Sequence, residues 1–291
     1  MLKKRVFLEK ASKRICLLDG ATGTALMAAG MPKGCCKEQW ILENPETMIE
    51  LQRRYAAAGS EIIYAPTFQS NPPALAAFGL DHQTEEINAR LVGLSRSAAP
   101  GCLIAGNLTT MKMYMDSGSE TNFDRMAAAY RRQIRGLLKG GADLLVAETL
   151  LYPIEARAVL AAAEAEGAET VLCSFTMKAD GTLYSGEQAG DRLSELEQAG
   201  AAAIGFNCVA MSEQTPMLVR KLRTQIQGLL LCKPNAGIPA VDASGAKAYP
   251  VTARGYAELM GKCVLAGANL IGGCCGTTPE YIAEIRKCLS A

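Results

Sequence analysis

Two adjacent cysteines, Cys274 and Cys275, lie in a glycine-rich segment near the C-terminus, where residues 272–279 are Gly-Gly-Cys-Cys-Gly-Thr-Thr-Pro. A short apolar run precedes the segment, and Thr278 and Pro279 are typical of the N-cap and first position of a helix. Neighbouring side chains of a regular strand point to opposite faces. Both thiols can therefore reach one point only if the backbone leaves strand geometry, which glycine permits. A metal ion is the simplest reason for such convergence, and it needs a third ligand.

Cys208 is the candidate for that third ligand. It ends the segment Gly205-Phe206-Asn207-Cys208, directly after an apolar run. Three thiolates with one open position are typical of a catalytic zinc site, because structural zinc has four protein ligands. Buried structural thiols are the alternative, since burial is the usual fate of a cysteine. His82 is the single histidine, so any metal is held mainly by sulfur or oxygen.

Two carboxylates, Asp19 and Glu148, also end apolar runs, where a charge is costly unless it is paired or faces a site. An internal salt bridge or a helix N-cap would explain them without a function. The functional interpretation is capture of a cationic group such as an amino group. Asn235 lies in Lys233–Pro239, where two prolines around a glycine indicate a rigid segment.

The chain alternates short apolar runs with longer amphipathic segments, which predicts strand–helix units and a parallel sheet. Eight units in 291 residues predict an α/β fold with one domain, residues 1–291, forming a single (β/α)8 TIM barrel. A doubly wound open sheet is the alternative, but eight similar units favour closure. Residues 19–24 lack the glycine spacing of a dinucleotide site, which argues against a nicotinamide cofactor. The eight runs are Ile15–Leu18, Glu61–Tyr64, Cys102–Ala105, Leu144–Ala147, Thr170–Phe175, Ala203–Phe206, Leu229–Cys232 and Ala268–Ile271.

A barrel of this kind carries its chemistry at the carboxyl ends of its strands. We therefore expect the polar residues that follow the apolar runs to gather at one rim. These residues are Asp19, Thr67, Asn107, Glu148, Thr176, Cys208, Asn235, Cys274 and Cys275.

Composition excludes several classes of protein. The formal net charge is +1 and no basic block occurs, which argues against nucleic acid and anionic membranes as partners. No apolar run approaches the length of a membrane span, and the N-terminal apolar stretch is too short for a signal peptide. We therefore expect a cytoplasmic protein whose eleven cysteines are reduced, either buried or metal-bound.

Several motifs together resemble the homocysteine S-methyltransferase family. They are Leu17–Thr24, Thr67-Phe68, Gly205–Cys208, Pro234–Gly237 and Gly273–Pro279. The resemblance runs from about Ile15 to the end. Within the family, the sequence most resembles the homocysteine-binding domain of cobalamin-dependent methionine synthase. It implies a zinc ion on Cys208, Cys274 and Cys275 that also takes the homocysteine sulfur. It further implies amino-acid recognition at the positions of Asp19, Gly20, Thr67 and Glu148.

The resemblance implies a transferase that makes methionine, with methylcobalamin on a partner corrinoid protein as methyl donor. Coordination deprotonates a thiol whose pKa is otherwise near 8.5, so no side-chain base is required. Asn235 or water is the candidate oxygen for the open metal position before substrate binds. Two other readings stay open: methyl transfer from S-methylmethionine or betaine, and a non-catalytic zinc–thiolate module that docks a corrinoid protein.

Two departures from the family pattern concern the donor. Residues 106–110 are Gly-Asn-Leu-Thr-Thr where many relatives have Gly-Pro, and a methionine-rich stretch, residues 111–115, follows. We expect this loop, residues 107–115, to border the site. Folate and cobalamin modules are absent from the sequence, so it is either a stand-alone subunit or a fragment of a larger protein.

Overall fold

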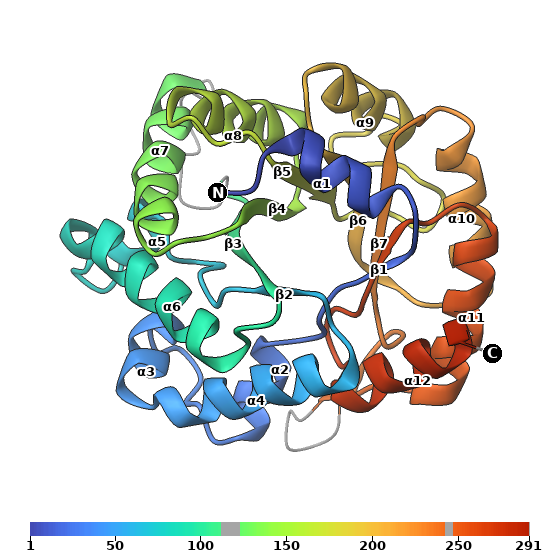
Figure 1. The fold of residues 1–291 in the computed structure, drawn as a ribbon, viewed down its shortest axis with the longest axis horizontal. Coiled ribbons are helices and arrows are strands. Elements are labelled where there is room, and N and C mark those ends of the chain that lie inside the picture. Colours follow the sequence, from blue (N-terminus) through green and yellow to red (C-terminus); the bar gives the residue numbers. More distant parts are fainter. Residues whose placement is uncertain (112–122, 242–246, 291) are drawn as a thin grey trace.

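The computed structural model describes residues 1–111, 123–241 and 247–290, and its main feature is a barrel of eight parallel strands (Figure 1). The strands pair in the order β1-β10-β7-β6-β5-β4-β3-β2, and a parallel bridge between Leu18 and Ile62 joins the two edge strands. The sheet is therefore closed, which confirms the predicted barrel. The strands are β1 (Cys16–Leu17), β2 (Ile62–Tyr64), β3 (Leu103–Thr109), β4 (Leu144–Leu150), β5 (Val171–Phe175), β6 (Ala203–Ala210), β7 (Leu229–Asn235) and β10 (Leu270–Ile271).

Helices surround the strands, and α1 (Lys4–Ala11) lies across one end of the barrel (Figure 1). The others are α2 (Gly23–Ala28), α3 (Lys37–Glu43), α4 (Pro45–Ala58), α5 (Pro72–Ala76), α6 (Thr84–Ala98), α7 (Phe123–Lys139), α8 (Pro153–Ala165), α9 (Ala189–Gln198), α10 (Thr215–Arg223), α11 (Ala253–Leu265) and α12 (Pro279–Ser290), with a 3₁₀ turn, η1, at Asp81–Gln83. No helix within the described residues is long and apolar enough to cross a membrane.

The elements agree closely with the sequence prediction. Each of the eight apolar runs overlaps one strand, and Pro279 begins α12 as expected. Five glycines that follow helices have the positive φ of a left-handed cap, namely Gly59, Gly141, Gly167, Gly200 and Gly267. The sequence did not predict the antiparallel pair β8 (Ala240–Val241) and β9 (Lys247–Ala248), because two-residue strands carry no readable period.

Two layers of apolar side chains build the core. One fills the barrel, and it includes Leu18, Val146, Leu172 and Leu231 together with Phe7 of α1. The other lies between the strands and the surrounding helices. Because alternate residues of a strand face alternate layers, each strand contributes to both. Helix α1 closes the barrel at the amino ends of the strands, which leaves the carboxyl ends for a site.

Candidate metal centre and substrate pocket

The three predicted cysteines converge at the carboxyl ends of β6 and β10. The Sγ atom of Cys208 lies 3.1 Å from that of Cys274 and 3.9 Å from that of Cys275, and all three lie within 4.8 Å of one another. Tetrahedral zinc with Zn–S bonds of about 2.3 Å separates its sulfur ligands by about 3.8 Å. The trio therefore fits a zinc ion, and within the described residues no second group of three cysteine, histidine or acidic side chains could hold a metal ion.

The turn after β10 presents Cys274 and Cys275 together through backbone contacts. The amide of Cys274 donates to the carbonyl of Pro234 at 2.7 Å, and the carbonyl of Cys275 accepts from Ala236 at 2.9 Å. Gly276 then reverses the chain with a φ of 81°. A side chain at this glycine would collide with the ring of Tyr249. The glycines thus let both thiols leave strand geometry, as the sequence predicted.

A local distortion of β6 brings Cys208 next to Cys274 and Cys275. Cys208 and Thr149 have φ values of 56° and 58°, and they are the only non-glycine residues with positive φ in the described chain. The strand register shifts at both places, between Asn207 and Ala210 in β6 and between Ala147 and Leu150 in β4. Such bulges redirect side chains next to active sites.

Asn207 connects the two distortions. Its Oδ1 atom accepts from the Thr149 amide at 2.7 Å and from the Ser174 hydroxyl at 2.9 Å, while its Nδ2 donates to the Thr149 hydroxyl at 2.7 Å. The residue is fully buried. Although it belongs to the motif that contains Cys208, the sequence did not indicate this role, because an asparagine inside a strand has no distinctive spacing.

Asn235 lies beside the cysteines and links their backbones. Its Nδ2 donates to the carbonyl of Cys208 at 3.1 Å, and its Oδ1 accepts from the amide of Cys275 at 3.0 Å. Both polar atoms of the side chain are therefore engaged in positioning the two ligands. Asn235 therefore lies next to the trio and holds the backbones of Cys208 and Cys275, and it does not line the cavity.

A cavity of about 180 Å³ opens beside the trio at the carboxyl ends of the strands. This volume suits a small substrate rather than a drug-sized ligand. Of the residues expected to bind substrate, Gly20 and Glu148 line the cavity. Asp19 and Thr67 are buried behind its wall: the Thr67 hydroxyl donates to the Asn107 carbonyl at 2.9 Å.

The cavity wall also includes residues that were not predicted as site residues, among them Lys37, Tyr64, Phe68 and Lys233. Their signal in the sequence is weak, because a lysine next to a cysteine or proline is common on surfaces. Asn107, which was expected only at the rim, also lines the cavity. Its Nδ2 donates to Glu148 Oε1 at 2.9 Å, and its Oδ1 has no partner among the described residues.

Lys233 neutralises the buried carboxylates. Its side chain is 4% exposed, and its Nζ lies 3.4 Å from Asp19 Oδ1 and 4.6 Å from the centre of the Tyr64 ring. Burial raises the pKa of Asp19 to about 6 and also raises the pKa of Glu148, although Lys233 opposes both shifts. Burial alone would lower the pKa of Lys233, but Glu148 and Asp19 together hold it above its usual value. Asp19 therefore has the internal ion pair considered from the sequence.

The three thiols lie close enough to shift one another's pKa. Hydrogen bonds from the Cys208 and Cys274 thiols lower the pKa of Cys275, while the same contacts and burial raise the pKa of Cys208. Tyr249 stands beside them, and the pKa of its hydroxyl is raised to about 12 by burial and by the charge of Cys275. This tyrosine was not predicted, because it precedes Pro250 in a loop without periodic pattern.

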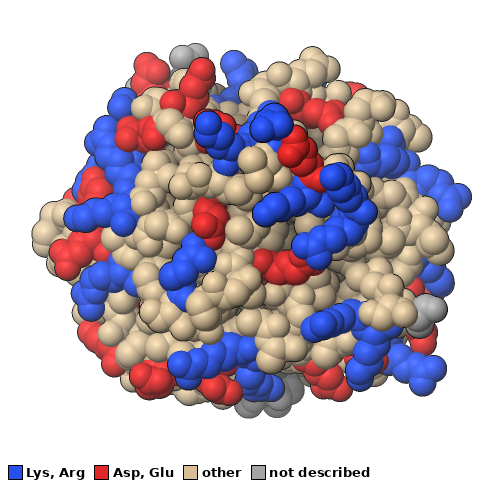
Figure 2. Space-filling view, viewed as in Figure 1, with Lys and Arg blue, Asp and Glu red and all other residues tan. Residues whose placement is uncertain are grey.

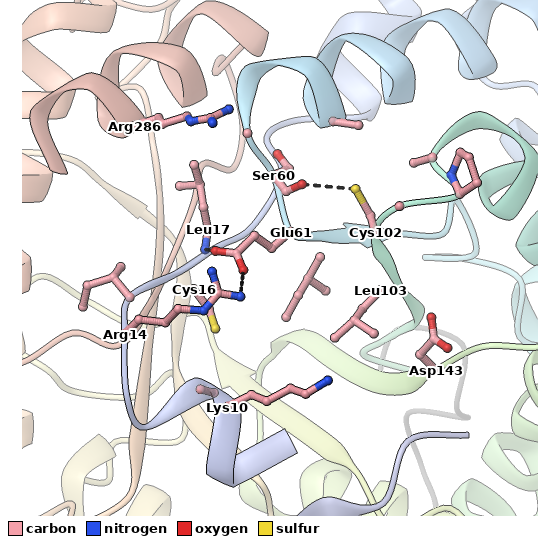
Figure 3. Close-up of a pocket in the computed structure, with 18 of the residues that line it drawn as sticks. Lys10, Arg14, Cys16, Leu17, Ser60, Glu61, Cys102, Leu103, Asp143 and Arg286 are labelled. Carbon is pink, nitrogen blue, oxygen red and sulfur yellow. Dashed lines mark hydrogen bonds and ion pairs between the residues drawn. The ribbon is translucent and has the colours of Figure 1, made fainter. Parts of the chain in front are cut away.

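A larger cavity, about 940 Å³, lies at the opposite end of the barrel, beside α1 (Figure 3). Basic and acidic side chains gather on this face (Figure 2), and Arg14 pairs there with Glu61. Its thiols are poor nucleophiles: burial raises the pKa of Cys16 to about 11 and also raises that of Cys102. The smaller cavity, which holds the cysteine trio, is therefore the better candidate for chemistry.

Comparison with known proteins agrees with this geometry. The family model for homocysteine S-methyltransferase matches residues 16–289. Methionine synthase of Mycobacterium leprae is 28% identical over 296 residues, which cover 96% of this chain and 24% of that protein, so the chain spans about a quarter of this relative. The methionine synthase of Mycobacterium tuberculosis is 29% identical over 300 residues, with 96% and 25% covered.

Solved structures give the same result. The metallated form of the homocysteine methyltransferase MmuM from Escherichia coli superposes with a TM-score of 0.80 and 28% identity, over 97% of this chain and 98% of that one. The residues matched by the family model, 16–289, include Cys208, Cys274 and Cys275. The chain therefore belongs to the homocysteine S-methyltransferase family.

Proposed function

We propose that residues 1–291 act as one homocysteine-binding domain that transfers a methyl group to the thiol of homocysteine and so makes methionine. The observation that carries this proposal is the convergence of three thiols, from Cys208, Cys274 and Cys275, on the wall of a small charged cavity. The metallated form of MmuM supports a bound metal ion, since that relative matches nearly end to end, and a set of three thiolates suits zinc.

A zinc ion held by the trio would bind the substrate thiol and lower its pKa, so that the sulfur reacts as a thiolate at neutral pH. The protein's own side chains orient the rest of the amino acid. Glu148, held by Asn107 at 2.9 Å and by Asn207 at 3.3 Å, faces the cavity as partner for the ammonium group. The free Oδ1 of Asn107 offers a second acceptor. The sulfur loses its proton and forms the new S–CH3 bond, while the donor keeps the electrons of the bond that breaks.

We propose methylcobalamin on a partner corrinoid protein as the donor. The support is the similarity to one quarter of two methionine synthases, which implies that other modules or partners complete the reaction. A small sulfonium or quaternary ammonium donor, such as S-methylmethionine or betaine, is the second candidate. This second donor class is favoured by the match to MmuM. That chain is a homocysteine methyltransferase, and the match covers 98% of it.

The test is a donor screen with the purified protein after its zinc content has been measured. We expect one zinc per chain and methionine from homocysteine with methylcobalamin. Turnover with S-methylmethionine or betaine alone, without a corrinoid, would replace the first donor by the second. Tight zinc and homocysteine binding with no turnover from any donor would instead indicate a non-catalytic module.

A further inference from the structure

The cavity contains a partner for the ammonium group of an amino acid, but the carboxylate of the same amino acid also needs one. Only two cationic side chains, Lys37 and Lys233, line the described wall of the cavity. Lys233 is engaged, because its ammonium group lies 3.4 Å from Asp19 and its pKa responds to Glu148 as well. Lys37 is therefore the cation with capacity for another anion.

Lys37 is well placed but loosely held. It begins α3, its side chain is 16% exposed, and its Nζ lies 5.1 Å from the centre of the Phe68 ring, which also lines the cavity. Glu38 Oε1 is 3.9 Å from the ammonium group, which is longer than a hydrogen bond. Glu38 is itself held by the amide of Gln69 at 3.1 Å. The lysine therefore has hydrogen-bond donors available for a ligand.

The charges of the cavity form a pattern that matches a zwitterion. Glu148 supplies a negative group, the cysteine trio supplies the thiol site, and Lys37 supplies a positive group. The positive charge of Lys37 also acts to lower the pKa of Glu148, so the two side chains interact electrostatically across the cavity. An uncharged alkane thiol would displace water from Lys37 and Glu148 without replacing that water by an oppositely charged group, and the loss of solvation is costly for a charge.

We propose that Lys37 binds the α-carboxylate of the substrate and thereby selects thiols that are α-amino acids. This assignment rests on the proposed function. Together with Glu148 and the thiol site it gives three points of attachment, which is the minimum needed to distinguish the two enantiomers of an amino acid. Lys37 is thus a specificity residue that contacts the substrate away from the reacting sulfur.

The experiment measures binding of two probes to the zinc-loaded protein by calorimetry. L-Homocysteine carries the carboxylate, whereas 3-aminopropane-1-thiol is the same molecule without it. We expect Lys37→Met to raise the Kd of homocysteine by about tenfold or more and to leave the Kd of 3-aminopropane-1-thiol unchanged. In turnover, KM for homocysteine should rise while kcat stays close to that of the unmodified protein. Lys37→Arg should retain most of the affinity.

Two control variants distinguish this role from others. Lys33→Met removes an exposed lysine of the same segment and should change neither Kd. The double variant Lys37→Met/Glu38→Gln should still bind homocysteine weakly; restored affinity would show that Lys37 only neutralises Glu38. Equal loss for both probes, or no loss for homocysteine, would also overturn the assignment. Failure of the unmodified protein to bind homocysteine would overturn the proposed function together with it.

Discussion

Asn207 connects the two backbone distortions beside the candidate metal centre. It joins the bulge that carries Cys208 to the bulge that carries Thr149, and its own amide is buried and fully used. It also donates to Glu148, the proposed partner of the substrate ammonium group, at 3.3 Å. One side chain thus positions a metal ligand and a substrate-binding group together. Side chains in this supporting position affect metal affinity without touching the ion.

Replacing Asn207 with alanine should weaken the metal centre. The Thr149 amide would lose its acceptor, at a cost of about 1–3 kcal/mol of folding free energy, and zinc affinity should fall by about 10–100-fold. Denaturant unfolding and competition with a zinc chelator measure the two effects. Asn44→Ala, which alters an exposed asparagine, is the control and should leave zinc affinity unchanged. An Asn207 variant with normal zinc affinity would contradict the positioning role.

Cys274→Ala should abolish both zinc binding and methyl transfer, because two thiolates cannot hold the ion in a catalytic geometry. Metal analysis of the purified variant, followed by the methionine assay, tests this expectation. Cys288→Ala serves as the matched control, since that thiol is exposed on α12. Full zinc occupancy in the Cys274 variant would exclude the three-cysteine site.

At this scale the sequence predicted the thiols better than their surroundings. A pair of cysteines between glycines is unusual enough to indicate chemistry, and the third followed from strand order. Lys233 and Lys37 could not be found in the same way, because their meaning depends on which side chains the barrel places against them. Asp19 illustrates the reverse: the sequence located it at a strand end, but only the packing shows its contact with Lys233.

At the scale of the elements, β4 and β6 continue beyond the apolar runs that predicted them. The runs ended at Ala147 and Phe206, whereas the strands end at Leu150 and Ala210. Backbone pairing does not require apolar side chains, so polar residues such as Glu148 can continue a ladder at the rim. The bulges lie in these polar extensions. Hydrophobic periodicity therefore predicted the strands but not the irregular ends that form the site.

The outer helices are joined by ion pairs, of which Glu166 makes two. It follows α8 and accepts from Arg131 at 2.8 Å and from Arg135 at 3.0 Å, both on α7. The hydrogen bond from Arg135, and then that from Arg131, lower the pKa of Glu166. A lowered carboxyl pKa adds stability above the unfolded value of 4.5. That contribution disappears as the pH falls through the folded value.

Glu166→Gln should therefore destabilise the protein near neutral pH and have less effect in acid. Because the arginines are partly exposed, the expected loss is only about 0.5 kcal/mol. Urea unfolding at a series of pH values measures it, and the difference from the unmodified protein should shrink as the pH is lowered below 4.5. A constant difference across that range would show that the carboxylate charge is not the source of the stability.

At the scale of the whole molecule, the apolar helix packing that closes the barrel and the candidate metal centre lie at opposite ends of the barrel. Phe7 and Ala11 of α1 close the amino end with apolar contacts, and the cysteine trio stands at the carboxyl end. The alternation of runs and helices was sufficient to predict this arrangement, because eight such units close in one common way. The contribution of α1 was not predicted, since the segment precedes the first strand and is rich in basic residues.

Phe7→Ala should lower the stability of the fold without changing zinc binding or activity. Phe7 is 2% exposed, and its truncation should cost about 3–5 kcal/mol of folding free energy. Zinc content and kcat, measured well below the melting temperature, should stay unchanged because the ring is remote from the trio. A Phe7 variant that remained folded but lost activity would mean that the two ends are coupled.

Both ends of the chain lie near the cavity beside α1. Leu2 and Leu289 line it, on the side of the barrel away from the cysteines. An affinity tag, a fluorophore or a surface linker attached at either terminus would therefore leave the mouth of the substrate pocket open to solution. Immobilised protein should bind a small substrate in this pocket as readily as free protein does. The architecture makes this chain well suited to a sensor or a flow reactor anchored by its ends.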